Sequence, residues 1–213
     1  IPVMKKSMIS LVLLFAGTVG MQLSACNKKN GTDTDSTLTV AEKQSLAFMI
    51  EEEKMAFDVY TLQFTHWGIT QFQNIKESEN RHMASVRSLL SKYGVPDPSA
   101  GNGIGVFSNG VISQLFLQLS AKADSSDWQA LTVGAIIEEV DIRDLKEQLL
   151  LTNKQEIRQV YENLMRGSRN HLRAFVEQLS FRGIIYQPSY LSREEFDAII
   201  NSPKETGSGR NAN

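Results

Sequence analysis

Apolar residues recur at steps of three and four between Gly68 and Gly94, which is the spacing of one face of an α-helix. The residues of this face are Phe72, Ile75, Glu79, His82, Val86, Leu89 and Tyr93. A carboxylate and an imidazole therefore lie in the middle of a face that should contact a hydrophobic core. Burying these two groups costs several kcal/mol unless another group compensates them. A bound metal ion is the simplest compensation, so the Glu79/His82 pair predicts a metal site inside a helical protein.

Six segments carry helical patterns, which predicts an all-α fold. They run from Thr39 to about His66, from Thr70 to Tyr93, from Val111 to about Ala121, from residues 125–127 to about Leu151, from Asn153 to near Gly183, and from Ser192 to Ile200. Thr39 and Glu42 have the spacing of a capping box at the first segment. Asn153 can cap the fifth.

The four long helices are expected to form two antiparallel hairpins, because the loops near Gly68 and residue 152 are short. A long link, Val95 to Gly110, separates the second long helix from the third. This order is typical of a ferritin-like antiparallel four-helix bundle with a long crossover, here with a short C-terminal helix added. The expected organisation is a signal segment at 1–26, a flexible tether at 27–38, this domain at 39–201, and a disordered tail at 202–213.

Every long helix carries polar residues midway along its apolar face. The residues expected to converge at mid-height of the bundle are Glu53, Glu79, His82, Glu138, Asp141 and His171. Four carboxylates and two neutral imidazoles would carry a charge of about −4, which two divalent ions would cancel, and without metal such a layer should be strongly destabilising or partly protonated. The pattern therefore predicts two bound divalent metal ions.

Some assignments stay open at this point. Glu52 also follows an apolar stripe and could replace Glu53, and Glu139 could replace Glu138, although Glu53 and Glu138 lie on the better apolar faces. Tyr60, two turns after Glu53, is either a core aromatic or a phenol with a role in the chemistry of the site. Four arginines flank the histidines and are either surface residues or groups that orient the carboxylates: Arg81, Arg166, Arg169 and Arg173.

The N-terminus has the features of an export signal. Lys5 and Lys6 precede a short apolar run from Ser10 to Val19, and small residues lead to Cys26. The run is shorter than the ~20 residues of a transmembrane helix. Leu-Ser-Ala-Cys at 23–26 resembles the bacterial lipobox, which implies cleavage before Cys26 and lipidation of that residue. The resemblance predicts a lipoprotein anchored to a bacterial membrane and facing the periplasm or the exterior, whereas an ordinary signal peptide is the alternative.

The composition argues against several partners and cofactors. The formal net charge is −2 and the basic residues are dispersed, so no nucleic-acid partner is expected. Cys26 is the only cysteine, which excludes an intramolecular disulfide and a rubredoxin-like cysteine site within this sequence. A homodimer is compatible with these features.

The motifs on the predicted helices resemble those of rubrerythrin and other ferritin-like di-iron proteins. More closely, the stretches EEEKMAFDVY, SENRHM, VGAIIEEVDIRDL, YENLMRGSRNHLRAF and YLSREEFDAII resemble the DUF2202 family over about Thr39 to Ile200. The ferritin-like resemblance implies a di-iron or di-manganese centre that reacts with O₂ or peroxide. The departure is Ser168, which stands where such proteins carry a glutamate three residues before His171. Asp141 can replace that carboxylate, or the site can hold one ion or another metal such as zinc.

These features predict a lipid-anchored metal-binding protein with an oxidase or peroxidase type of redox activity, in which iron is the first choice of metal. The alternative is a non-catalytic module that holds metal or binds a partner through an incomplete site.

Overall fold

The structure, a computed structural model, describes residues 37–207 of the 213-residue chain. Within this range the chain forms only helices: α1 (Val40–Trp67), α2 (Thr70–Lys92), α3 (Gly110–Ala123), α4 (Asp127–Leu149), α5 (Gln155–Phe181) and α6 (Arg193–Ile200). The all-α prediction is confirmed, including the short C-terminal helix. None of the helices between residues 37 and 207 is long and apolar enough to span a lipid bilayer. The signal segment, Cys26 and most of the tether lie outside the described residues.

The ends of the first helix follow the expected local chemistry. The Thr39 hydroxyl accepts the Glu42 N–H at 3.1 Å, and the Glu42 carboxylate accepts the Thr39 N–H at 2.8 Å, so the capping box is present. Helix α1 ends at Trp67 and is capped by Gly68, whose φ of 64° is left-handed and free of steric cost in glycine.

Helix α4 is capped by Ser126, which accepts the Gln129 N–H at 3.2 Å. The start of α5, by contrast, differs from the prediction. Asn153 is not the cap of α5, because that helix begins one residue later than an Asn153 cap would require, after Lys154 and without a side-chain cap. Instead the Thr152 hydroxyl accepts the Lys154 N–H at 3.1 Å.

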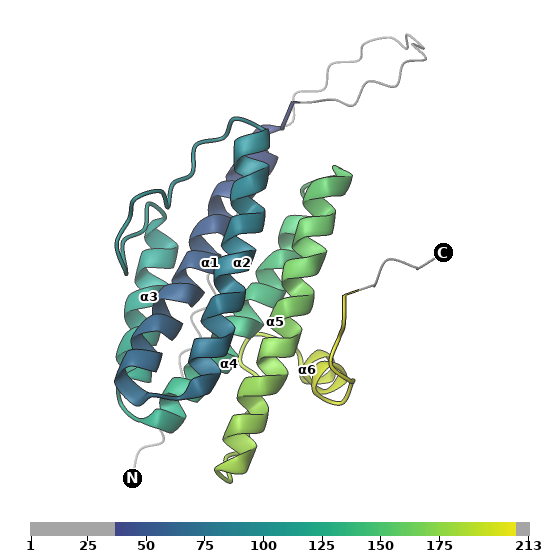
Figure 1. Cartoon of the computed structure of the whole chain (residues 1–213). Coiled ribbons are helices and arrows are strands. Elements are labelled where there is room, and N and C mark those ends of the chain that lie inside the picture. The colour runs from purple at the N-terminus through teal and green to yellow at the C-terminus, as the bar shows by residue number, and fades with distance from the viewer. Residues whose placement is uncertain (1–36, 208–213) are drawn as a thin grey trace, which may run out of the picture. The chain divides into compact units, whose positions relative to one another are not determined.

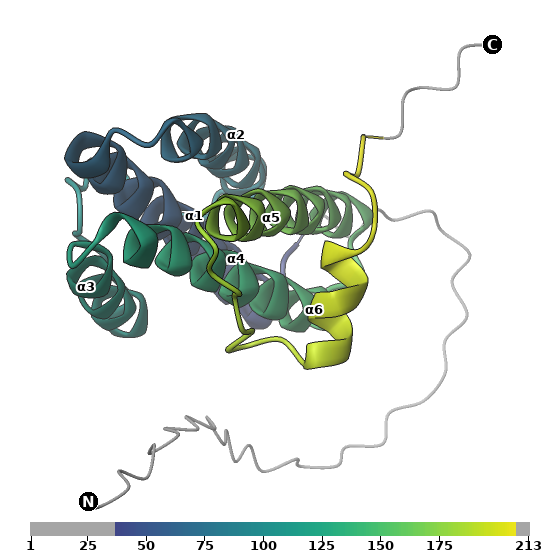
Figure 2. The same cartoon turned by 90° about the horizontal axis from the view of Figure 1, so that it is seen from below.

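The four long helices form two hairpins that pack together (Figure 1). Residues 68–69 join α1 to α2, and residues 150–154 join α4 to α5. The long crossover is confirmed, and α3 lies within it. Viewed along the bundle, α1 and α4 lie at the middle, with α2, α5 and α3 around them (Figure 2). Because α1 and α4 contact neighbours on several sides, most of their faces are buried.

The charged run at residues 51–54 of α1 is buried, and two of its members hold the crossover in place. The Glu51 carboxylate accepts the N–H of Ser108 and of Asn109, the latter at 2.8 Å. Lys54 donates to the Gly103 carbonyl at 2.8 Å and pairs with Asp58 at 2.5 Å. Successive helix residues point about 100° apart, so neighbouring charges in this run reach different parts of the protein.

Two hydrophobic clusters lie along the bundle, one on each side of the polar layer. One contains Tyr60, Phe72, Leu131 and Phe175, and the other contains Leu46, Met49, Leu90 and Tyr161. In α1, α2 and α5 the polar residues fall between the positions that belong to the two clusters, and in α4 Glu138 and Asp141 lie between Ile137 of the first cluster and Leu145 of the second. The apolar clusters therefore separate the polar layer from both ends of the bundle.

Residues 202–207, expected to be disordered, lie along α5 instead. The Glu205 carboxylate accepts hydrogen bonds from Arg169 at 2.7 and 2.5 Å and from Arg173 at 3.0 Å. Arg173 also donates to the Ile199 carbonyl at 2.9 Å. Two of the arginines considered as groups that orient the metal ligands therefore bind the C-terminal segment.

Replacing Glu205 with alanine is expected to lower the free energy of unfolding by roughly 1–3 kcal/mol, because hydrogen bonds between charged groups are lost. The hydrogen bonds from Arg169 lower the pKa of Glu205 to about 2, against the effect of partial burial. A lowered pKa means that this stabilisation is present above about pH 4.5 and is lost as the pH falls toward 2. Urea unfolding at pH 7 and pH 3 measures it, with Glu177→Ala, an exposed residue of α5, as the control. Equal losses for the two variants would contradict the prediction.

Candidate metal centre

Helix α2 presents Glu79 and His82 to the interior from one face, since residues three apart lie on the same side of a helix. Glu79 is fully buried, and His82 Nδ1 lies 2.8 Å from Glu79 Oε2. The same nitrogen lies 3.1 Å from Glu53 Oε2 of α1. Glu53, Glu79 and His82 thus form one group whose potential ligand atoms all lie within 4.8 Å of one another.

A second group shares Glu79 with the first. His171 Nδ1 of α5 lies 2.8 Å from Glu79 Oε1 and 3.4 Å from Glu138 Oε2 of α4. These three residues also offer ligand atoms within 4.8 Å of one another. Each long helix contributes at least one residue, and the two oxygens of Glu79 face different histidines. Glu79 therefore belongs to both groups, each of which could hold a metal ion.

Several nitrogen and oxygen atoms in these two groups of candidate ligands lie close together but have no hydrogen-bond partner. Although His171 Nδ1 and Glu79 Oε1 are 2.8 Å apart, neither atom has a hydrogen-bond partner. Glu79 Oε2, Glu53 Oε1 and Glu138 Oε2 are buried and unpartnered as well. Unpartnered buried oxygens are costly and rare. Imidazole nitrogens and carboxylate oxygens are ligands for divalent transition metals, so the residues present fit a metal.

The electrostatics of the layer are strongly coupled. Burial raises the pKa of Glu53 to about 7 despite the opposing effect of His82, and it also raises the pKa of Glu138. Burial would raise the pKa of Glu79 too, but the two imidazoles outweigh it and lower that pKa. Burial disfavours both imidazolium ions, yet the neighbouring carboxylates raise the pKa of His82 well above its usual value and that of His171 to about 9. In the metal-free protein, protonated imidazoles therefore provide the positive charge at neutral pH.

The structure brings five of the six predicted residues into these groups, and Asp141 lies beside them. Asp141 is fully buried and neither of its carboxylate oxygens has a hydrogen-bond partner, but it belongs to neither group. Burial and the carboxylates of Glu52 and Glu53 raise its pKa well above the usual value. Its role as a metal ligand stays a prediction.

The choice between Glu52 and Glu53 is decided by the direction of each side chain. Glu53 faces His82, as expected. Glu52 instead lies beside Asp144, and burial together with this second carboxylate raises the pKa of Glu52 well above its usual value. Asp144 was not singled out from the sequence. Its position three residues after Asp141 could have indicated a second buried carboxylate, since that spacing places both residues on one helix face.

The choice between Glu138 and Glu139 is decided in the same way. Glu138 faces His171, whereas Glu139 binds the segment that leads to α6. The Glu139 carboxylate accepts the N–H groups of Ser189, Tyr190 and Leu191 at 2.9, 2.7 and 2.8 Å, and the hydroxyl of Tyr186. Glu139 is therefore a structural residue.

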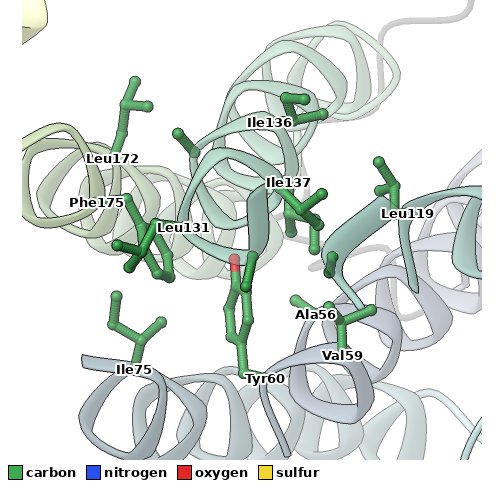
Figure 3. Close-up of a cluster of buried hydrophobic side chains, with 14 of the residues drawn as sticks. Ala56, Val59, Tyr60, Ile75, Leu119, Leu131, Ile136, Ile137, Leu172 and Phe175 are labelled. Carbon is green, nitrogen blue, oxygen red and sulfur yellow. The ribbon is translucent and has the colours of Figure 1, made fainter. Parts of the chain in front are cut away.

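Tyr60 contacts the candidate centre through one of its carboxylates. Its hydroxyl donates to Glu138 Oε1 at 2.6 Å, and Figure 3 shows the phenol oxygen pointing toward the helix that carries Leu131 and Ile137. The ring also packs against Phe72 and Phe175, with centroids 5.8 and 5.4 Å away. Tyr60 is thus both a core aromatic and a hydrogen-bond donor to a candidate ligand.

Ser168 offers no ligand to either group. It is fully buried, and its hydroxyl donates to the Leu164 carbonyl of its own helix at 3.2 Å. Helix α5 therefore contributes His171 alone among the candidate ligand atoms in the two groups.

Residues 42–203 match a family described as "Uncharacterized protein domain (DUF2202)". The chain belongs to the DUF2202 family. A relative from Methanocaldococcus jannaschii, "Uncharacterized protein MJ0754", is 48% identical over 169 residues, which cover 79% of this chain and 91% of the relative. The chain also matches the crystal structure of hypothetical protein MJ0754 from Methanococcus jannaschii with a TM-score of 0.77 and 45% identity. That match covers 85% of this chain and all of the other, so this DUF2202 protein shares its fold.

Proposed function

We propose that this DUF2202 protein is a ferritin-like metal-binding protein whose polar layer holds two divalent metal ions and supports oxidase or peroxidase chemistry. The observation that carries the proposal is the position of Glu79, whose two oxygens face two histidines in two buried groups. Iron is the first choice, because imidazole and carboxylate together suit it, and manganese or zinc could occupy the same ligands.

The chain's own residues have distinct roles in this proposal. Glu79 would bridge the ions, Glu53 with His82 would hold one, and Glu138 with His171 would hold the other. Two iron ions held in this way would supply electrons to O₂ or to peroxide. The Tyr60 hydroxyl orients Glu138 through its 2.6 Å hydrogen bond and holds a proton next to the centre. Burial and Glu138 raise the pKa of Tyr60 well above its usual value, so the proton stays on the oxygen at neutral pH.

The test is metal analysis of the full chain, purified in detergent without a chelator and then loaded with Fe²⁺ under anaerobic conditions. About two ions per chain are expected, followed by an absorbance change and consumption of O₂ or peroxide when either is added. A chain that binds no metal would overturn the metal site.

A non-catalytic module that holds metal is the second candidate. Ser168 supplies no carboxylate, and Glu53, Glu79 and Glu138 are fully buried, which favours a site with restricted access. Two bound ions without consumption of O₂ or peroxide would support this candidate.

Metal affinity is expected to increase as the pH rises, because protons compete with metal for the imidazole nitrogens. The pKa of His171 is raised to about 9 and that of His82 is raised well above its usual value. Below the pKa of each imidazole, every proton that the metal displaces should increase metal affinity by up to tenfold for each unit that the pH rises. By the same linkage, the metal-free protein loses stabilisation from these pairs as the pH rises through about 9. Zn²⁺ titrations against a competing chelator between pH 6 and 8.5 measure the slope, and an affinity that does not change with pH would contradict the prediction.

We also propose that the protein is anchored to a bacterial membrane through acyl chains on Cys26, facing the periplasm or the exterior. The sequence before Cys26 and the polar residues that follow it support the proposal. Replacing Cys26 with serine is expected to move the protein from the membrane fraction to the soluble fraction without changing its helicity, since stable anchoring needs two or more acyl chains. A variant that still sediments with membranes after a salt wash would refute the lipid anchor.

A further inference from the structure

Gly167 lies in the interior of α5, next to the ring of His82 from α2. A Cβ atom added at Gly167 would lie 2.6 Å from both Cε1 and Nε2 of His82, and 3.8 Å from Cε1 of His171. Such a contact is much shorter than van der Waals separation, so the imidazole occupies the space that any other residue's side chain would need. The His82 and His171 rings lie 5.6 Å apart with an interplanar angle of 26°.

Backbone conformation does not explain a glycine here. Gly167 is helical, and its φ is not among the positive values found at Gly68, Gly94, Gly101, Gly105 and Gly183. A glycine in a helix interior costs about 0.5–1 kcal/mol relative to alanine. The close approach of His82 to the α5 backbone is the feature that requires the missing side chain.

The contact constrains the direction of the imidazole. The Cε1–Nε2 edge of His82 rests on α5, while Nδ1 lies within 2.8 Å of Glu79 and 3.1 Å of Glu53. Only about 12% of the His82 side chain is exposed. A methyl group at position 167 would push the ring away from α5 or would separate α2 from α5. Either movement changes the distances from Nδ1 to the two carboxylates.

We propose that Gly167 is a positioning residue of the metal centre, which lets the His82 ring lie against α5 so that its Nδ1 faces Glu53 and Glu79. This inference rests on the proposed metal site and extends it to a residue that offers no ligand atom. Residues that orient metal ligands typically change metal affinity 10–100-fold when they are replaced.

The experiment compares Gly167→Ala with a matched control in the full chain. Gly134→Ala is the control, because the added Cβ would lie 2.5 Å from Phe175, a core residue that is not a candidate ligand. Zn²⁺ affinity is measured by competition with a chelator. Gly167→Ala is expected to bind Zn²⁺ 10–100-fold more weakly than wild type, whereas Gly134→Ala is expected to lower stability while its folded form keeps wild-type affinity.

A double-mutant cycle tests whether Gly167 acts through His82. In a His82→Ala background the ring is absent, so Gly167→Ala should cause no further loss of Zn²⁺ affinity. If Gly167→Ala alone does not fold, the double variant is expected to fold, because the clashing ring has been removed. Additive losses in the cycle, or a double variant that also fails to fold, would overturn the proposal.

A readout without metal separates this proposal from the proposed function. In the metal-free wild-type protein, NMR should show a nuclear Overhauser effect between His82 Hε1 and the α protons of Gly167. Absence of this signal would overturn the positioning role even if metal binds. Its presence in a chain that binds no Zn²⁺ or Fe²⁺ would instead refute the metal site and leave the contact intact. Wild-type affinity in Gly167→Ala would also overturn the proposal.

Discussion

Replacing Glu79 with alanine is expected to remove both metal ions from the centre. Glu79 is the one residue that belongs to both candidate groups in the described part of the chain. Its oxygens lie 2.8 Å from the Nδ1 atoms of His82 and His171, so its loss removes a candidate ligand from each of the two groups. The metal-free protein is also expected to lose roughly 3–5 kcal/mol of stability, because buried imidazolium groups lose their carboxylate partner.

Metal analysis and urea unfolding of Glu79→Ala test this expectation, with two further variants for comparison. His82→Ala removes a ligand from the first group alone and should retain about one ion per chain. Asp141→Asn alters a buried carboxylate outside both groups and tests whether Asp141 is a ligand as the sequence predicts: loss of one ion would confirm that role, and two retained ions would refute it. A Glu79→Ala variant that keeps one ion would show that the two groups bind independently, and one that keeps both would refute the bridging position.

Replacing Glu139 with alanine is expected to lower the free energy of unfolding by roughly 3–5 kcal/mol while leaving metal binding intact. The Glu139 carboxylate accepts three backbone N–H groups from residues 189–191 and the hydroxyl of Tyr186. The hydrogen bonds from the Leu191 N–H and the Tyr186 hydroxyl are buried, and each buried donor left without a partner costs about 1–3 kcal/mol. These donors belong to the segment that leads to α6, so that segment should detach first.

Urea unfolding and hydrogen exchange of residues 184–200 measure the loss. Glu139→Gln is the matched control, because its single amide oxygen preserves the shape and part of the accepting capacity and should cost less. Metal content should stay at about two ions per chain in both variants. A loss of metal in Glu139→Gln, with the fold intact, would mean that the structural role assigned to Glu139 is wrong.

The helices were predictable because their signals are local. The apolar spacing around Glu79 and His82 identified the inward face of α2 before any neighbour was known, and the Thr39/Glu42 capping box marked the start of α1. Asn153 shows the limit of such signals. A residue suited to capping does not start a helix when its neighbours provide another arrangement, here the hydrogen bond from Lys154 N–H to Thr152.

Adjacent carboxylates were harder to assign, since residues 51–54 and the pair Glu138/Glu139 are buried throughout. In a helix surrounded by neighbours, burial no longer distinguishes one side from another. Glu51, Glu53 and Glu139 point at different partners, and only the positions of the crossover, α2 and the segment before α6 decide which carboxylate faces a histidine.

The sequence by itself determined the all-α fold, the two hairpins with their long crossover, and a polar layer that contains Glu53, Glu79, His82, Glu138 and His171, because helical periodicity and turn chemistry depend on residues close in the chain. Tertiary structure alone decided that Glu79 faces both histidines, that Asp141 lies beside the two groups, and that Gly167 accommodates His82. These outcomes depend on the distances between side chains of different helices, which the packing of whole helices sets and no local pattern encodes.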